Sequence, residues 1–382
     1  MNQTIYLDNA ATTWPKPESV YQAVDHFNRH MGGNPGRGSH GKTLEAAGIL
    51  LDAREAVARL LGIPHPSRIA FTKNVTEAIN TALRGILNPG DHVIISSMEH
   101  NAVARPLTTL SRQGVSVTRV PCASDGTLDP AFIDKSWRKN TRMVCLTAAS
   151  NVTGTIMPIE EAGRICREKE GIFLVDSAQS AGVIPTHAEK QYIDILAFTG
   201  HKALYGPQGT GGFYLRTGIN MRPLMEGGTG SLSELTVQPD FMPDQFESGT
   251  PNTPGIAGLE AGICYISEKG ISVIREHEVK LMDALMDGLS QIKGLVMYGP
   301  AASRSRTGVI SFNLGDWECG ELSHILHQKA GIITRSGLHC APLAHGTMGT
   351  TRQGTCRASI GWFTTDKDIQ RLLETLDQLS GS

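Results

Sequence analysis

Short apolar runs, separated by polar or glycine-rich turns, recur through the first half of the chain. Between several of these runs, apolar residues recur at helical spacing, as in residues 44–61 and 77–83. The alternation from Ile69 to Tyr214 predicts an α/β fold, with a mostly parallel sheet covered by helices on both faces. The predicted strands are residues 5–8, 69–71, 92–96, 115–120, 141–147, 171–176 and a run that begins at 196.

The pattern changes after Arg216, where two glycine-rich stretches predict irregular loops. Helical periodicity then returns at residues 256–266, 273–289 and 366–379, with strands at 309–313 and around 332–335. These elements predict a smaller α+β unit at the C-terminus. We therefore expect a large domain over residues 16–255 and a small domain built from residues 1–15 and 256–382.

Composition narrows the classes of function. The net charge is −2, so no basic field favours nucleic acid as a partner. No apolar run reaches the roughly 18 residues of a membrane span. The seven cysteines are scattered without a Cys-x-x-Cys pair, which argues against a disulfide framework or a zinc site. Together with an N-terminus that lacks an export signal, this predicts a cytoplasmic protein without a metal.

Two charged residues at consecutive strand ends indicate the chemistry. Asp176 closes one apolar run, and Lys202 follows the next, beside Thr199 and His201. A lysine in this position can form a Schiff base with an aldehyde cofactor. A carboxylate nearby can keep the pyridine nitrogen of pyridoxal phosphate protonated, so that the ring acts as an electron sink. For an isolated lysine, a solvated loop position is the alternative.

The motifs Asp-Ser-Ala-Gln (176–179) and Thr-Gly-His-Lys (199–202) resemble those of the class V aminotransferases, and specifically of the cysteine desulfurases. The resemblance extends from Tyr-Leu-Asp-Asn-Ala-Ala-Thr-Thr (6–13) to Cys-Arg-Ala-Ser (356–359). It implies a fold-type I pyridoxal-phosphate enzyme that forms a homodimer, with a seven-stranded, mostly parallel sheet in the large, cofactor-binding domain. The cofactor is then bound through Lys202 and Asp176.

The resemblance also implies roles for further residues. The cofactor would be contacted by Val75, Thr76, His100, Asn151, Gln179, Thr199, His201 and, across a dimer interface, Thr250. His100 would stack on the pyridine ring and take part in proton transfer, while Asn151 would also meet the substrate carboxylate. From the residues alone, the turn before Thr76 is either an anion site at a helix start or an ordinary helix N-cap.

A second chemical centre lies in residues 335–342, where Cys340 stands in a loop with glycine and proline. An exposed thiolate there can attack a sulfur atom. The stretch resembles the cysteine loop of group II desulfurases, except that proline directly follows Ala341. The loop from Cys340 to Arg357 is also extended by residues 346–351. Arg357 would bind the substrate carboxylate as a fork with help from Arg335, although either arginine can instead form a surface ion pair.

These observations favour conversion of L-cysteine to L-alanine with a persulfide on Cys340, and a sulfur-acceptor protein as a partner. Selenocysteine lyase, cysteine-sulfinate desulfinase and small-molecule aminotransferase remain alternatives within the family. Outside it, residues 36–43 match the phosphate-loop pattern of nucleotidases, but the polar residues before them do not predict the strand that such a loop requires. The resemblance places Arg37 and His40 near an active-site entrance instead. A non-enzymatic partner in sulfur transfer is a further alternative.

Overall fold

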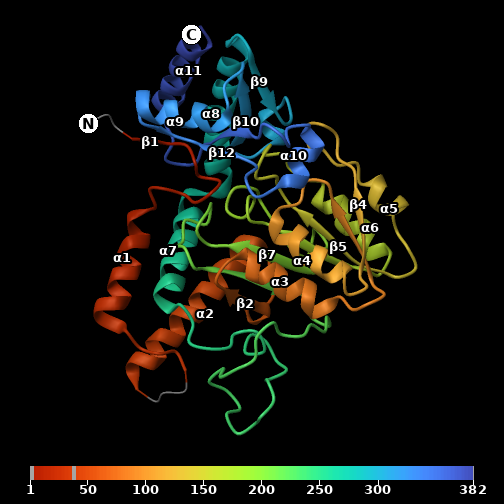
Figure 1. The fold of residues 1–382 in the computed structure, drawn as a ribbon. Coiled ribbons are helices and arrows are strands. Elements are labelled where there is room, and N and C mark those ends of the chain that lie inside the picture. Colours follow the sequence, from red (N-terminus) through yellow and green to blue (C-terminus); the bar gives the residue numbers. More distant parts are fainter. Residues whose placement is uncertain (1–3, 37–39, 382) are drawn as a thin grey trace.

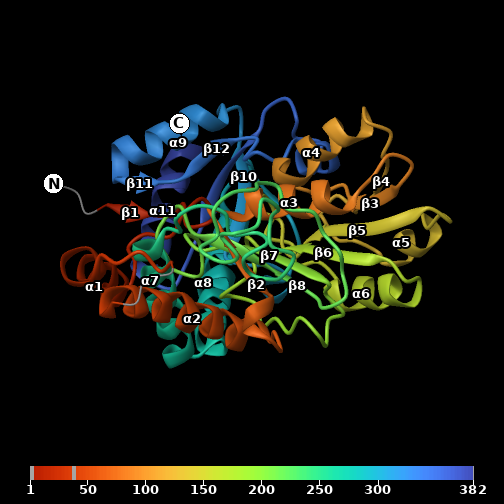
Figure 2. The same cartoon turned by 90° about the horizontal axis from the view of Figure 1, so that it is seen from below.

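The computed structural model describes residues 4–36 and 40–381 and is organised around a seven-stranded sheet (Figures 1 and 2). In sheet order, the strands are β2 (Ile69–Thr72), β8 (Gly211–Leu215), β7 (Ile195–Thr199), β6 (Ile172–Asp176), β5 (Thr141–Thr147), β3 (His92–Ser96) and β4 (Ser116–Val120). Only β8 runs antiparallel to its neighbours. The predicted mostly parallel sheet of seven strands is confirmed.

Helices cover both faces of this sheet, as Figure 2 shows. Every residue of β3, β6, β7 and β8 is buried, which explains why these strands are almost continuously apolar. Alternate residues enter two cores: Phe173 and Val175 of β6 join one, and Ile172 and Leu174 join the other. The helices on one face are α3 (Val75–Ile86) and α4 (Asn101–Ser111); those on the other are α2 (Gly41–Leu61), α6 (Ile159–Glu168) and α7 (Thr253–Lys269). α1 (Glu18–His26) packs on α7, and the short α5 (Ala131–Lys135) contacts α6.

A second unit lies above the large sheet in Figure 1 and has its own apolar core. Its antiparallel sheet has the order β12 (Arg335–Gly337), β13 (Thr355–Ser359), β10 (Val309–Leu314) and β9 (Leu295–Tyr298). Its helices are α8 (Ile271–Gln291), α9 (Cys319–Ala330) and α11 (Asp366–Ser380). The N-terminal β1 (Ile5–Tyr6) pairs with β11 (Ile332–Ile333) in this unit. The α+β unit is thus present, whereas domain boundaries at residues 15 and 255 stay predictions.

The segment from Cys340 to Arg357 differs from the loop expected there, because it contains a helix, α10 (Pro342–Met348). Proline at the first helical position needs no N–H partner, and Gly349 ends the helix with φ of 74°, a left-handed conformation that glycine adopts readily. α10 is docked by Thr347, whose hydroxyl donates to Ser97 Oγ at 2.8 Å. Seven of the residues after the cysteine thus form a helix that contacts the segment between β3 and α4.

The residues that precede the phosphate-loop match do not form the strand that a nucleotide site requires. The residues before it form α1 and a π-helical turn, Phe27–Met31, in place of a strand. Lys42 Nζ donates to the carbonyl oxygens of His30 and Met31, at 3.0 and 3.1 Å, and so caps that turn. His40 is the N-cap of α2 and accepts from the Thr43 N–H, whereas Arg37 lies outside the described residues. Among the described residues, no helix has both the length and the apolar character needed to cross a bilayer.

Candidate active site

The carboxyl ends of β3, β5, β6 and β7 bring most of the predicted site residues together. Asp176 ends β6 and pairs in register with Thr147 at the end of β5, which leads to Asn151. Thr199 ends β7, and Lys202 follows it. Ligands of open α/β sheets bind at this edge, outside the carboxyl ends of the strands. The sheet topology therefore gathers residues that are far apart in the sequence.

Asp176 is buried and Lys202 is half-buried, and each influences the charge of the other. Asp176 is 2% exposed, and its Oδ1 accepts from the Ala178 N–H at 2.9 Å. Burial raises the pKa of Asp176, while the Ala178 N–H and Lys202 act in the opposite direction. Burial lowers the pKa of Lys202 to about 8, and Asp176 opposes this shift. An amine with this pKa is a stronger nucleophile near neutral pH than an ordinary lysine, because more of it is unprotonated.

The imidazole of His100 is oriented by its own helix. His100 is the N-cap of α4, and its Nδ1 accepts from the Ala102 N–H at 3.0 Å. The proton of the neutral ring is therefore on Nε2, the atom left for a ligand. Burial lowers the pKa of His100 to about 4, with Lys202, Arg335 and Arg105 adding to the effect. The ring is accordingly neutral at physiological pH.

Cys340 stands in a tight turn whose backbone is fixed on two sides. His339 and Cys340 have φ of 48° and 58°, a left-handed conformation that is strained for non-glycine residues. The Asn101 N–H donates to the Cys340 carbonyl at 2.8 Å, and Asn151 Nδ2 donates to the His339 carbonyl at 2.7 Å. The thiol is exposed, and its Sγ lies 3.8 Å from Arg335 Nη2. The contacts of Asn101 and Asn151 thus tie the cysteine to the strand-end site.

Arg357 is completely buried and holds an ion pair that sequence reasoning missed. Its Nη2 donates to Asp8 Oδ1 at 2.6 Å, and its Nη1 donates to the Asn151 carbonyl at 2.9 Å. Its Nε has no hydrogen-bond partner in the described structure. The Nε–H therefore remains available to a ligand carboxylate, while Nη1 and Nη2 are both engaged within the protein. Asp8 lies within the N-terminal motif of residues 6–13, so a carboxylate in that motif was the available signal.

The same N-terminal motif also contacts the main chain of the turn that carries Lys202. Thr12 Oγ1 donates to the His201 carbonyl at 3.0 Å, and Thr13 Oγ1 donates to the Lys202 carbonyl at 2.8 Å. Gln179 Nε2 donates to the Ala10 carbonyl at 2.9 Å. The main-chain positions of His201 and Lys202 thus depend on a segment at the other end of the chain.

Comparison with known proteins agrees with this geometry. The family model described as aminotransferase class V matches residues 5–372. The chain belongs to the class V aminotransferase family. A probable cysteine desulfurase of Methanothermobacter thermautotrophicus is 37% identical over 99% of this chain and 95% of that protein, and a cysteine desulfurase of Pectobacterium atrosepticum is 34% identical over 98% and 92%.

Solved structures of cysteine desulfurases have the same fold. The apo enzyme of Thermococcus onnurineus superposes with a TM-score of 0.93 at 31% identity, covering 99% of this chain and 95% of that one. The S-sulfonic acid form of an Escherichia coli cysteine desulfurase gives 0.88 at 28% identity, covering 98% and 94%. The predicted family and fold are confirmed.

Class V aminotransferases use pyridoxal phosphate, and the residues present here fit this group. Thr199 Oγ1 and His201 Nδ1 are buried without a hydrogen-bond partner in the described structure. Such atoms are costly unless a ligand satisfies them, and phosphate oxygens are suitable acceptors. Burial lowers the pKa of His201 to about 4, so the ring is neutral before an anion binds. These unpartnered donors lie on the strand end and the turn that lead to Lys202.

The turn before α3 supplies further donors. Asn74 is an ordinary N-cap, because its side chain accepts from the Glu77 N–H at 3.0 Å. Glu77 Oε2 accepts in return from the Lys73 N–H at 2.8 Å. Val75 and Thr76 occupy the first two helical positions, whose N–H groups have no acceptor within a helix. The N-cap alternative therefore applies to Asn74 and leaves the N–H groups of Val75 and Thr76 available to an anion.

Thr250 is the predicted site residue that this chain does not bring to Lys202. It is exposed and lines a groove of about 600 Å³ with Arg54, Glu247 and Gly228. Lys202 lines a different and much smaller cavity, of about 30 Å³, with Thr13 and Gln179. Thr250 also lines a cavity of about 240 Å³ with Lys73 and Glu77 at the turn before α3, but it does not line the cavity that contains Lys202.

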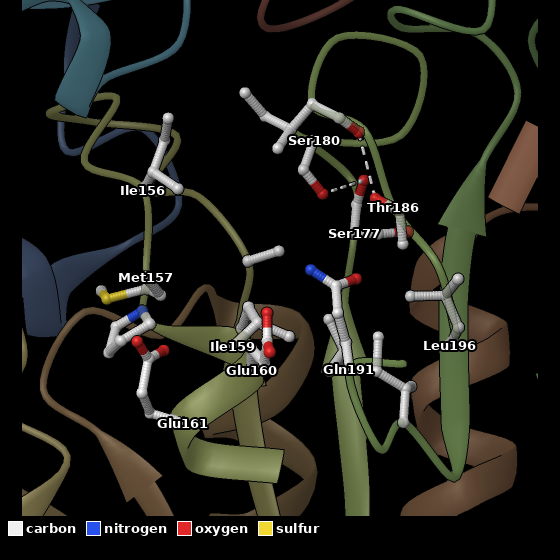
Figure 3. Close-up of a pocket in the computed structure, with 15 residues that line it drawn as sticks. Ile156, Met157, Ile159, Glu160, Glu161, Ser177, Ser180, Thr186, Gln191 and Leu196 are labelled. Carbon is white, nitrogen blue, oxygen red and sulfur yellow. Dashed lines mark hydrogen bonds between the residues drawn. The ribbon is translucent and has the colours of Figure 1, made fainter. Parts of the chain in front are cut away.

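Figure 3 shows another cavity, of about 190 Å³, between the start of α6 and the turns that follow β6. Its walls are mainly apolar, with Ile156, Met157 and Leu196, while the Gln191 amide faces the cavity and Glu160 lies across from it. None of the predicted site residues is among the described residues that line it. This cavity is therefore separate from the candidate active site around Lys202.

Proposed function

We propose that this protein is a pyridoxal-phosphate-dependent cysteine desulfurase that converts L-cysteine to L-alanine and captures the sulfur on Cys340. The observation that carries the proposal is the position of the exposed Cys340 thiol. Its turn is hydrogen-bonded to Asn101 and Asn151, which follow the strands that end at the candidate cofactor site. A transaminase has no need of a thiol at this place.

Each residue has a role that its environment supports. Pyridoxal phosphate, when bound, supplies an electron sink for the electron pair left at the substrate Cα. Lys202 holds the cofactor and then moves the Cα proton, for which its pKa of about 8 suits it. Asp176 would pair with the pyridine nitrogen and Gln179 would contact the ring, while Asn151 and the Nε–H of Arg357 would bind the substrate carboxylate with Arg335. His100 would stack on the ring and could exchange a proton through Nε2, because its Nδ1 accepts from the Ala102 N–H.

Sulfur capture follows from thiolate chemistry. The Cys340 thiolate attacks the substrate sulfur, a new S–S bond forms, and the bond between this sulfur and the substrate Cβ breaks. The electron pair of that bond stays with the three-carbon fragment, which gains protons and leaves as L-alanine. The sulfur is oxidised to the persulfide level while Cβ is reduced, so no external oxidant is needed. Arg335 Nη2 lies 3.8 Å from Sγ, within reach to donate a hydrogen bond to it.

We further propose a homodimer in which Thr250 serves the phosphate site of the partner copy. Exposed apolar residues on the long segment before it, Leu235, Val237 and Phe241, are suited to burial against another chain. The cytoplasm is the proposed location, because all seven cysteines are free. Selenocysteine lyase is the second candidate, since Lys202 and Asp176 would act in the same way on a selenol substrate.

The test is to supply L-cysteine to the protein loaded with pyridoxal phosphate. We expect L-alanine and, in the absence of a thiol acceptor, a mass increase of one sulfur atom on the Cys340 peptide. Alanine formation without any persulfide on Cys340 would contradict the proposed capture step. Transamination products in place of alanine would contradict the reaction class.

A further inference from the structure

The proposed function leaves open which molecule accepts the sulfur from Cys340. We propose that the acceptor is a protein whose receiving cysteine is flanked by carboxylates. Cys340 is framed by residues 100–124 and 322–365, which contain basic but no acidic side chains, and we call the surface around its thiol the cationic mouth. This inference rests on the proposed persulfide and concerns only its discharge. It follows from the charge of the two chain segments that frame the cysteine.

Those two segments lack acidic residues altogether. No Asp or Glu occurs between Glu99 and Asp125, or between Glu321 and Asp366. The first stretch contains α4, and the second runs from α9 through the Cys340 turn and α10 to β13. In the same stretches, the basic residues are Arg105, Arg112, Arg119, Lys329, Arg335, Arg352 and Arg357. Such a one-sided composition is unusual in a chain whose net charge is only −2.

The structure places the two segments against each other at Cys340. The Asn101 N–H, at the start of α4, donates to the Cys340 carbonyl at 2.8 Å. Thr347 of α10 donates to the Ser97 hydroxyl, just before α4, at 2.8 Å. The exposed thiol is therefore bordered by both carboxylate-free segments.

Two arginines at this mouth keep their charge available. Arg335 Nη2 is 3.8 Å from Sγ, and the exposed Arg105 lies on α4 near enough to act on the His100 ring. Within residues 4–36 and 40–381, neither forms an ion pair with a carboxylate, in contrast to Arg357, which is bound to Asp8. Of the acids close to the site, Glu99 and Asp176 are buried, and the partly exposed Asp8 is neutralised by its ion pair with Arg357. An approaching partner therefore meets uncompensated positive charge.

The positive charge around Cys340 affects neutral and anionic molecules differently as they approach the thiol. L-cysteine is a zwitterion without net charge, so it gains little from a distant positive potential. An acceptor with carboxylates beside its thiol is attracted, and charge complementarity of this kind acts mainly on the rate of association. The chemistry of discharge is a thiol exchange: the acceptor thiolate attacks the outer sulfur, the S–S bond to Cys340 breaks, and Cys340 leaves as a thiolate beside Arg335. Sulfur moves at the same oxidation level, so no other reactant is required.

The experiment uses the full-length protein carrying the persulfide on Cys340. Short peptides with one cysteine flanked by glutamates, glutamines or lysines are added, and loss of the persulfide is followed by mass spectrometry. Arg105→Gln is compared with wild type for each peptide, so that differences in intrinsic thiol reactivity cancel in the ratio. Arg59→Gln, on α2 at the other face of the sheet, is the control for loss of one positive charge, although Arg59, unlike Arg105, is paired with Glu55.

For the glutamate-flanked peptide at low salt, we expect Arg105→Gln to slow discharge by about 3- to 10-fold. The lysine-flanked peptide should be unaffected or faster, and added salt should remove the difference. Persulfide loading from L-cysteine should change little in either variant. Equal slowing by Arg59→Gln, or no dependence on peptide charge, would overturn the inference while leaving the proposed function intact.

Two further outcomes are separated by the same measurements. If 3-mercaptopropionate discharges the persulfide as fast as the glutamate-flanked peptide, and both exceed 2-mercaptoethanol equally, the acceptor is a small anionic thiol and the proposal of a protein is wrong. If no persulfide forms with L-cysteine in wild type, the failure lies in the proposed function instead.

Discussion

Arg357 Nη2 donates to Asp8 Oδ1 at 2.6 Å, although the two residues are 349 positions apart in the chain. The arginine side chain is 1% exposed and the aspartate side chain 18%, so the pair is largely removed from water. Buried charges of this kind need a partner, and breaking such a pair costs more than forming it contributes. Asp8 therefore orients the Arg357 guanidinium, whose Nε–H has no partner in the described structure.

We expect Asp8→Asn to lower the free energy of unfolding by about 1–3 kcal/mol, because an amide oxygen keeps a hydrogen bond but removes the opposing charge. The KM for L-cysteine should rise, since the guanidinium is no longer held in one orientation. Urea unfolding and steady-state kinetics measure the two effects. Asp25→Asn removes the partner of Arg29 in an exposed pair and is the control. An equal loss of stability in both variants would show that the Asp8 pair is not special.

The nucleophilic form of Lys202 should appear with a pKa of about 8, the value to which burial lowers it. Above this pH the amine is neutral, so covalent uptake of pyridoxal phosphate by the apoprotein should reach a plateau. Below it, the rate should fall about tenfold per pH unit, because only the unprotonated amine reacts. Borohydride trapping followed by peptide mapping at pH 6–9 tests this.

Lys16 provides an internal control for the same experiment. Burial also lowers the pKa of Lys16 to about 8. Its Nζ, however, donates hydrogen bonds to the carbonyl oxygens of Thr13 and His201. We expect the trapped cofactor on Lys202 and none on Lys16, and Lys202→Ala should lose the label. A label on Lys16 in the wild-type protein would contradict the assignment of Lys202.

Local sequence patterns predicted the large sheet well, because its strands are buried on both faces. β6 is the clearest case: five consecutive residues are buried, and the carboxylate that ends the strand stands out against them. Prediction was poorer where structure depends on contacts distant in sequence. The motif that contains Asp8 does not indicate its partner Arg357, 349 positions away, and α10 replaces part of the loop predicted between Cys340 and Arg357. Its signals, Pro342 at the start and Gly349 at the end, are recognisable only once the helix is known.

A buried acid beside the site should make stability depend on pH. Glu99 is fully buried, and its oxygens accept from Ser96 Oγ at 2.6 Å and from the Thr147 N–H at 3.0 and 3.1 Å. Burial raises its pKa to about 8, from an ordinary value of 4.5. Between pH 4.5 and about pH 8, Glu99 is protonated in the folded protein and ionised in the unfolded chain. The contribution of Glu99 to stability is therefore complete below pH 4.5 and is lost as pH rises through 8.

Glu99→Gln should flatten this dependence, because glutamine resembles the protonated acid and never ionises. The reduction in slope is at most about 1.4 kcal/mol per pH unit for one group. Glu278 on α8 has a pKa raised to about 8 by burial as well, so some slope should remain. Urea unfolding at pH 6 and pH 9 measures the change, with the exposed Glu45→Gln as control. The same slope in wild type and Glu99→Gln would mean that Glu99 is already ionised.

Sharing of Thr250 between two copies is testable by mixing variants. Suppose that each site takes Lys202 from one chain and Thr250 from the other. A mixed dimer of Lys202→Ala and Thr250→Ala chains then has one site with both substitutions and one site with neither. Activity should therefore return when the two weak variants are unfolded and refolded together. If Thr250 serves its own chain, every site in the mixture is defective and activity stays low. Cofactor retention after gel filtration gives a second readout that does not depend on turnover.

Carbanion chemistry at Lys202 and sulfur capture at Cys340 are different steps carried by different groups, and one substitution should separate them. Cys340→Ser should keep the cofactor and still change its absorption spectrum when L-cysteine binds. It should lose most alanine production, because a hydroxyl is a far poorer nucleophile toward sulfur than a thiolate. A selenol leaves more readily than a thiol, so part of the activity toward selenocysteine should survive. Alanine is measured from both substrates in both proteins, with Cys264→Ser, another exposed cysteine, as control. Undiminished turnover of L-cysteine by Cys340→Ser would remove Cys340 from the mechanism and favour a lyase that releases sulfide directly.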